Sequence, residues 1–233
     1  MSRWLLVLLV LVSPAAASEA RAQAPLVLSY GIEHETWGDI GTFSNTIRRE
    51  AGTTLVEARL RIEVSVLFGG LVLYREEAER LETWEDGRLA AYESATTVDG
   101  EVIRISGRAE GEQFLIQRPD GEIAAPAGIH PTNLWSLAMA SAETVMGTKS
   151  GSIVSVAVID GGRRGLEIGG REIETRYYRI EPRSDPKGVP FPQEGWFDAA
   201  GIPVRFAVIK DGDSVVFTMT NYAEVLAGWS GGQ

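Results

Sequence analysis

The stretch from Leu55 to Phe68 restricts the fold of this chain more than any other part of the sequence. Apolar residues occupy every second position, and polar or charged residues stand between them; the apolar set is Val56, Ala58, Leu60, Ile62, Val64, Val66 and Phe68. A period of two places one set on each side of a pleated strand. The stretch therefore predicts a long β-strand with one buried face and one solvated face.

Asp-Gly pairs mark the predicted turns between such strands. Tight hairpins favour these pairs because both residues tolerate positive φ. Five pairs occur in the chain: Asp86-Gly87, Asp99-Gly100, Asp120-Gly121, Asp160-Gly161 and Asp211-Gly212. With about ten to twelve strand-like segments, they predict an all-β, mainly antiparallel fold, either a single long curved sheet or a half-open barrel.

One segment has a helical period instead. Thr132 and Asn133 are competent N-caps, Gly147 suits a C′ position, and the apolar residues between them recur at helical spacing: Leu134, Trp135, Leu137, Ala138, Ala142, Val145 and Met146. The segment predicts one amphipathic helix docked on the sheet.

The N-terminus has the pattern of a secretory signal peptide. Arg3 precedes an unbroken apolar run from Trp4 to Val12, and small residues follow it. Cleavage after Ala22 fits best, within a range from Ala17 to Ala24. We therefore expect a signal peptide at 1–22, a single β-rich domain at 23–233 with a flexible glycine-rich tail at 226–233, and a periplasmic or secreted location.

Composition excludes several classes of partner and site. The chain has no cysteine, so it forms no disulfide and no thiolate metal site. Its formal net charge is −10, which is the wrong sign for nucleic acid or anionic lipid. Charge on both faces of Glu76–Glu82 disfavours a membrane-spanning barrel, so we expect no integral membrane protein.

Candidate catalytic and metal motifs fail on spacing. Glu33-His34-Glu35 lacks a second histidine four positions after the first, and in a strand His34 points away from the two glutamates. Gly228-Trp229-Ser230-Gly231-Gly232 matches a nucleophile elbow, but no helix, acid or histidine follows it. We therefore expect no catalytic residue, no metal and no cofactor, and a binding or interaction protein rather than an enzyme.

Acidic residues gather on the hairpin after Tyr74. They are Glu76, Glu77, Glu79, Glu82, Glu85 and Asp86. Paired carboxylates can perform acid–base work or hold calcium, but this spacing matches no calcium loop. We interpret the cluster as a solvated strand end.

The order of several short motifs resembles a family of exported bacterial β-rich proteins known only as a domain of unknown function. The motifs are Tyr30-Gly31-Ile32, Gly38-Asp39-Ile40-Gly41, Glu82-Thr83-Trp84-Glu85-Asp86-Gly87, Pro131-Thr132-Asn133-Leu134-Trp135 and Trp196-Phe197-Asp198 with Gly201. The resemblance implies an exported protein with a curved sheet, and it implies no reaction. The outline is also similar to periplasmic half-barrel lipoprotein carriers, which hold apolar ligands.

Of three functional hypotheses, a hydrolase is the least favoured, because catalytic triads and metal sites are missing; two others remain open from the sequence. The first is a carrier for an apolar small molecule in the cell envelope, with a ligand site lined by Val64, Phe68, Trp84, Trp135, Met139, Tyr178 and Trp196. The second is an envelope interaction or structural protein without a small-molecule site. In both, Trp135 faces the sheet.

Overall fold

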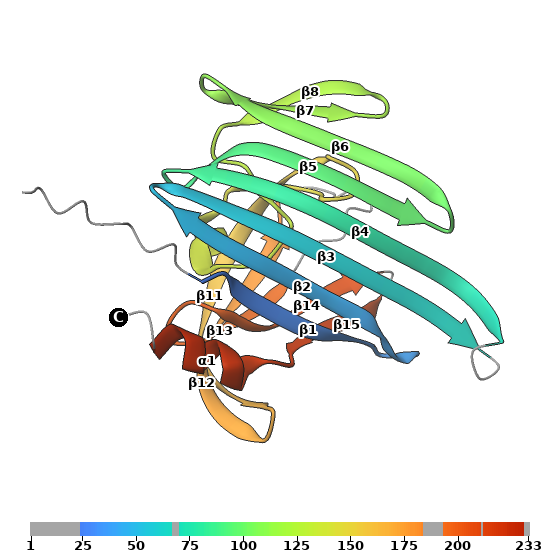
Figure 1. The fold of residues 1–233 in the computed structure, drawn as a ribbon, viewed down its shortest axis with the longest axis vertical. Helices are drawn as coiled ribbons and strands as arrows, with labels where there is room; N and C mark the ends of the chain where they lie inside the picture. The colour runs from blue at the N-terminus through green and yellow to red at the C-terminus, as the bar shows by residue number, and fades with distance from the viewer. Residues whose placement is uncertain (1–23, 67–69, 184–192, 211, 231–233) are drawn as a thin grey trace, which may run out of the picture.

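The computed structural model describes residues 24–66, 70–183, 193–210 and 212–230, and strands dominate them (Figure 1). The elements are β1 (Leu26–His34), β2 (Gly38–Glu50), β3 (Thr53–Val66), β4 (Leu71–Glu85), β5 (Arg88–Val98), β6 (Glu101–Glu110), β7 (Gln113–Arg118), β8 (Gly121–Pro126), β9 (His130–Pro131), the 3₁₀ helix η1 (Leu137–Ser141), β10 (Thr144–Met146), β11 (Ile153–Ile168), β12 (Arg171–Pro182), β13 (Glu194–Phe197), β14 (Pro203–Lys210), β15 (Asp213–Met219) and α1 (Tyr222–Ser230). The predicted signal peptide, Phe68, Asp211 and residues 231–233 of the predicted tail lie outside the described residues.

All fifteen strands join one sheet, in the order β8-β7-β6-β5-β4-β3-β2-β1-β15-β14-β13-β12-β11-β10-β9. The first eight strands form one meander and the rest form another, and the two meet where β1 pairs antiparallel with β15. Only the short β9–β10 pair is parallel among the described strands. Figure 1 shows β2 to β6 as a twisted front layer with β11 and β13 behind it. The predicted all-β, curved and half-open sheet is confirmed.

The alternating stretch forms β3, as its pattern predicts. Val56 and Ala58 are fully buried, whereas Arg59 and Arg61 are exposed. Leu60 lies opposite Ala78 on β4. The face that carries Val56 and Ala58 is called the inner face below, and the charged face is the outer face.

The Asp-Gly pairs have two different structural roles. Asp86 and Asp99 have φ of 48° and 49°, so each occupies the left-handed region of a tight hairpin turn, as predicted. Asp160-Gly161, by contrast, is no turn. It lies within β11, where the register with β12 shifts between Asp160 and Arg163. The extra residues form a bulge that bends a long strand without ending it.

A loop connects the two halves of the curved sheet across its inner face. In the described chain, no strand-to-strand hydrogen bonds join the two end strands, β8 and β9. The loop after β10 crosses the inner face of β4 and β5, where the carbonyl of Thr148 accepts hydrogen bonds from the Tyr92 hydroxyl at 2.9 Å and the Ser94 hydroxyl at 3.1 Å. Lys149 pairs with Glu76 at 3.0 Å. A Cβ on Gly151 would lie 2.9 Å from the Arg118 side chain, so the approach requires glycine. These contacts define the seam.

The helix predicted over Thr132–Gly147 is wrong. The segment instead contains extended chain, η1 and β10. Asn133 points into the core, where it bonds Glu82, and Thr132 receives the Thr148 amide through its hydroxyl at 3.2 Å. Because Thr and Asn bond to distant groups here, they do not cap a helix, and tertiary contacts outweigh the local period.

The described chain forms its α-helix at the C-terminus, in α1. Residues 226–230, which belong to the predicted flexible glycine-rich tail, lie in this helix. Asn221 anchors the helix start, because its side chain accepts from the Ser29 amide and donates to the Val27 carbonyl. The Tyr222 hydroxyl donates to Asp198 at 3.2 Å. These contacts dock the helix beside β1.

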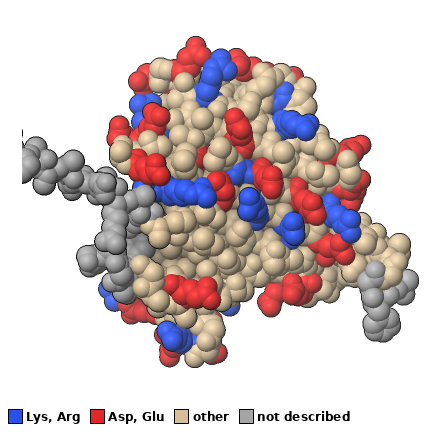
Figure 2. All heavy atoms as spheres, in the orientation of Figure 1, with Lys and Arg blue, Asp and Glu red and all other residues tan. Residues whose placement is uncertain are grey.

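The outer face carries mixed charge. Figure 2 shows basic and acidic side chains interspersed over the same face that Figure 1 presents. Ion pairs such as Arg75–Glu63 at 2.7 Å and Arg59–Glu79 at 3.6 Å lie between neighbouring strands. Such exposed pairs contribute little stability.

Candidate functional site

A buried carboxylate, Glu82, lies at the centre of the most distinctive polar cluster. Glu82 is 0% exposed. Its Oε2 accepts the indole N–H groups of Trp84 at 2.8 Å and Trp135 at 3.0 Å, and its Oε1 accepts the Asn133 amide at 2.7 Å. All three donors are neutral, so the carboxylate is solvated by the protein without an ion pair.

The strand and loop geometry assembles this cluster from two distant motifs. Glu82 and Trp84 are two residues apart on β4, so both face inward. Asn133 and Trp135 are likewise two apart in the extended chain before η1. The two indole rings lie edge to face at 5.7 Å, and the His130 ring lies 5.0 Å from Trp84. Two of the motifs that carry the family resemblance therefore meet at one carboxylate.

The surroundings shift the proton affinity of this cluster. Burial raises the pKa of Glu82 to about 7, although its three hydrogen bonds and the charge of Arg80 oppose that shift. Burial also lowers the pKa of His130. A carboxyl group with this pKa could act as a general acid, but Glu82 has no exposed surface. We interpret it as a buried proton-binding group and not as a catalytic one.

A small surface pocket of about 250 Å³ adjoins this cluster. Its lining includes Leu26, Arg49, Trp135 and Leu137, with the Ala199–Ile202 turn on the other side. Asp198 fixes that turn by accepting the amides of Ala200 and Ile202, each at 2.9 Å. Trp135 therefore separates the pocket from Glu82.

The opposite end of the inner face carries apolar side chains that are only partly covered, and it also holds the Glu76–Lys149 ion pair, because Glu76 lies opposite Ile62. Ile62 and Val64 on β3, and Val208 and Val215 on β14 and β15, point inward and remain half-buried. The register places them at one end of the sheet, because Ile62 faces Gly41, Gly41 faces Ile32, and Ile32 faces Phe217. These four side chains are called the open-end patch.

The seven residues predicted to line one ligand site do not form one cluster. Trp84 and Trp135 pack together at Glu82, and Met139 is buried in η1. Val64 lies in the open-end patch, and Phe68 lies outside the described residues. Tyr178 packs on Phe197 at 5.7 Å. Trp196 alternates with buried Gly195 and Phe197 along β13 and contacts Tyr177 at 5.0 Å.

The acidic hairpin is also not a uniformly solvated strand end. Glu77, Glu79 and Glu85 are exposed as expected, but Glu76 and Glu82 are buried on the inner face. Sequence reasoning missed Glu82 and Asn133 as partners. The sequence did contain one indication. Side chains alternate between the two faces of a strand, and Glu82 is therefore on the same face of β4 as Ala78 and Trp84.

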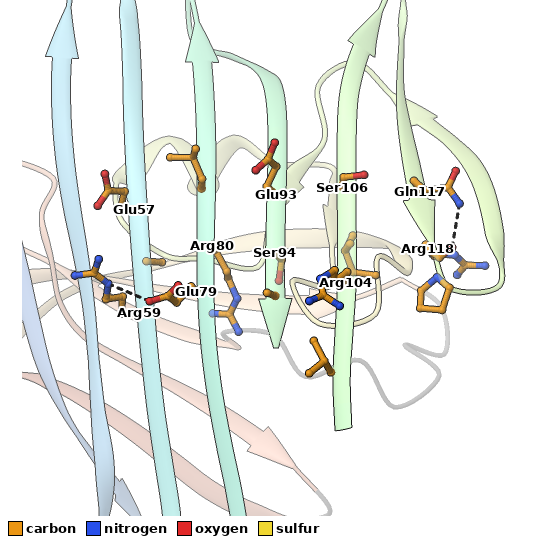
Figure 3. Close-up of a pocket in the computed structure, with 16 residues that line it drawn as sticks. Glu57, Arg59, Glu79, Arg80, Glu93, Ser94, Arg104, Ser106, Gln117 and Arg118 are labelled. Carbon is orange, nitrogen blue, oxygen red and sulfur yellow. Dashed lines mark hydrogen bonds and ion pairs between the residues drawn. The ribbon is translucent and has the colours of Figure 1, made fainter. Parts of the chain in front are cut away.

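A groove of about 890 Å³ crosses the outer face of β3 to β7 (Figure 3). Its walls are two cross-strand rows: one contains Glu57, Leu81, Glu93, Ser106 and Gln117, and the other Arg59, Glu79, Ala95 and Arg104. Both signs of charge occur along it. This groove does not suit an apolar molecule.

Two features are absent from the residues that the structure describes. No three or more His, Asp or Glu side chains there are grouped so that they could hold a metal ion. None of the helices there has the length and apolarity required to cross a membrane.

The sequence from residue 38 to 220 matches the family described as "Domain of unknown function (DUF6134)". The chain belongs to DUF6134. No curated protein matches it in sequence. A solved structure with a similar fold is the "Crystal Structure of Beta-barrel-like Protein of Domain of Unknown Function DUF1849 from Brucella abortus", with 12% identity and a TM-score of 0.59. The likeness covers 85% of this chain and 96% of that one, and at this identity it shows the fold alone.

Proposed function

We propose that this DUF6134 protein is an exported carrier that binds an apolar small molecule at the open-end patch. The observation that carries the proposal is that Ile62, Val64, Val208 and Val215 face inward but are not fully covered by the protein. Apolar surface left uncovered inside a curved sheet gains about 25 cal/mol per Å² when a ligand covers it. The Trp4–Val12 run supports the envelope location that belongs to the proposal.

A titration with the neutral fluorophore N-phenyl-1-naphthylamine tests the carrier. Val64→Gln and Val215→Gln each place an amide in the patch, so each should weaken binding about tenfold, the equivalent of losing a buried apolar contact. Val102→Gln is the matched control, because Val102 is also a strand valine but is 49% exposed. Wild-type protein without affinity for the probe would refute the carrier.

A second candidate, an envelope interaction protein, is favoured by a different observation. Leu71, Val72 and Leu73 at the start of β4 are 49%, 41% and 49% exposed. Because consecutive strand residues point to opposite faces, this end of the hairpin is apolar on both sides. Photo-crosslinking from position 72 in cells should then give one discrete adduct that position 102 does not give. A smear, or the same adduct from both positions, would contradict this candidate.

A further inference from the structure

Two polar side chains and one arginine nitrogen on the inner face lack the partners that Glu82 has. Asn45 and Thr96 are both 0% exposed. Within the described chain, the Asn45 amide oxygen, the Asn45 amide nitrogen and the Thr96 hydroxyl all lack a hydrogen-bond partner. Nε of Arg80 is also buried and unpaired. Buried polar groups are almost always satisfied, so three exceptions close together require an explanation.

The register places these groups around a floor of small residues. Asn45, Ala58, Arg80 and Ser94 lie opposite one another in one cross-strand row. Strands are about 4.8 Å apart, so Asn45 and Arg80 flank Ala58 at a separation of about 10 Å. Thr96 and Ala78 form the next row toward the open-end patch. A small polar group above Ala58 would meet donors from both sides.

The charge balance favours an anion. Arg80 is cationic and makes no ion pair in the described chain, whereas the nearby Lys149 is already paired with Glu76. The nearest acidic group along β4, Glu82, uses its oxygens for Trp84, Trp135 and Asn133. A guanidinium presents its N–H groups in a fork that matches a carboxylate or phosphate.

We propose that Arg80, with Asn45 and Thr96, forms an internal anion site that binds the acidic head group of an amphiphilic ligand. This inference rests on the proposed carrier function, because the tail of the ligand would cover the open-end patch. From Ala58 to Val64 the strand advances six residues, about 20 Å, which is long enough for the acyl chain of a medium-length fatty acid; Ala58 and Leu60 on this path are 1% and 8% exposed, so the chain must displace the protein that covers them. Asn45 and Thr96 are closed off from solvent, so the head group reaches them when the inner face parts at the seam.

Competition against the bound fluorophore separates the two proposals. Dodecanoate and dodecanol share a tail and differ in head group. Wild-type protein should bind dodecanoate at least tenfold more tightly than dodecanol, and Arg80→Met should lose this preference while it keeps its affinity for dodecanol. Arg104→Met is the control, because Arg104 is an exposed arginine on the outer face. Thr96→Val carries the same test if Arg80→Met does not fold.

Each outcome decides one of the claims. If the fluorophore binds but wild type does not prefer dodecanoate, or if Arg80→Met keeps the preference, the anion site is wrong and the carrier stands. If acetate displaces dodecanoate at comparable concentration, the site takes free anions and the amphiphile is wrong. If neither the fluorophore nor dodecanol binds, the carrier function itself fails.

Discussion

Two polar groups on the same inner face of β4, only two residues apart, are treated in opposite ways. Glu82 receives three hydrogen bonds from Trp84, Asn133 and Trp135, whereas the Nε of Arg80 receives no partner in the described chain. An unsatisfied buried polar group costs about 1–3 kcal/mol. The contrast shows that the fold satisfies Glu82 with its own donors and leaves the Arg80 Nε without a partner in the described chain, which is the observation behind the proposed anion site.

Removal of an indole at the Glu82 end should have the largest effect on stability. Trp84→Ala leaves a cavity and deprives Glu82 of one donor, so the free energy of unfolding should fall by about 3–5 kcal/mol. Urea denaturation measures it. Trp37→Ala is the matched control and should change stability by less than about 0.5 kcal/mol, because Trp37 is 47% exposed. Equal losses in both variants would show that the Glu82 end is not a packed core.

The proton affinity of Glu82 should make stability depend on pH. Its pKa is about 7 in the folded protein and 4.5 in the unfolded chain, so the folded state binds the proton more tightly. The resulting stabilisation, about 3 kcal/mol, is fully present below about pH 4.5 and is lost as pH rises through about 7. Stability measured between pH 5 and pH 8 should therefore decline in wild type.

Glu82→Gln sharpens this prediction. The neutral amide keeps an oxygen for the indole donors, and its NH₂ can donate to Asn133 Oδ1, which is buried without a partner, after the Asn133 amide rotates. The variant should therefore lose most of the decline and be more stable than wild type at pH 8. A decline of unchanged slope would assign the pH dependence to other groups.

The smallest effects should differ in sign between two neighbouring hydroxyls on β5. Ser94 donates to Thr148, so Ser94→Ala should lower the free energy of unfolding by about 1 kcal/mol. Thr96 has no partner, so Thr96→Val should raise it by a similar amount, since the change removes a buried unsatisfied hydroxyl with little change of shape. Differential scanning calorimetry on both variants tests the contrast. Destabilisation by Thr96→Val would mean that this hydroxyl is satisfied in solution.

The strands were predictable because local signals and tertiary contacts agree in them. The alternation over Leu55–Phe68 specifies which side of β3 is buried, and Asp86 and Asp99 adopt the positive φ that their hairpins require. The Thr132–Gly147 segment was misjudged because apolar residues at helical spacing also suit an irregular chain that fills a core. The helix α1 was missed because its sequence is rich in glycine near the end, including Gly228. Tyr222, Val225 and Leu226 nevertheless have helical spacing, and they pack on the sheet.

The candidate site was less predictable than the fold. Parity along β4 indicates that Glu82 faces inward, but no local pattern indicates that Asn133, fifty-one residues later, donates to it. The lack of partners at Asn45 and Thr96 is also invisible in sequence, because it depends on what lies above them in the folded chain. Only the cross-strand register reveals that Ala58 separates Asn45 from Arg80.

At the seam, the diameter of this curved sheet is set by side-chain and loop contacts and not by a strand ladder. In a closed barrel the number of strands and their stagger fix the diameter. Here β8 and β9 end the sheet, and closure depends on the Thr148 carbonyl, the Lys149–Glu76 pair and the fit of Gly151. A change of diameter would therefore require only that these few contacts at the seam be exchanged, because the hydrogen bonds between neighbouring strands would stay intact. Under the proposed carrier function, ligands of different width could occupy the same sheet, and amide hydrogen exchange at Thr148–Gly151 should be the first to slow when one is bound.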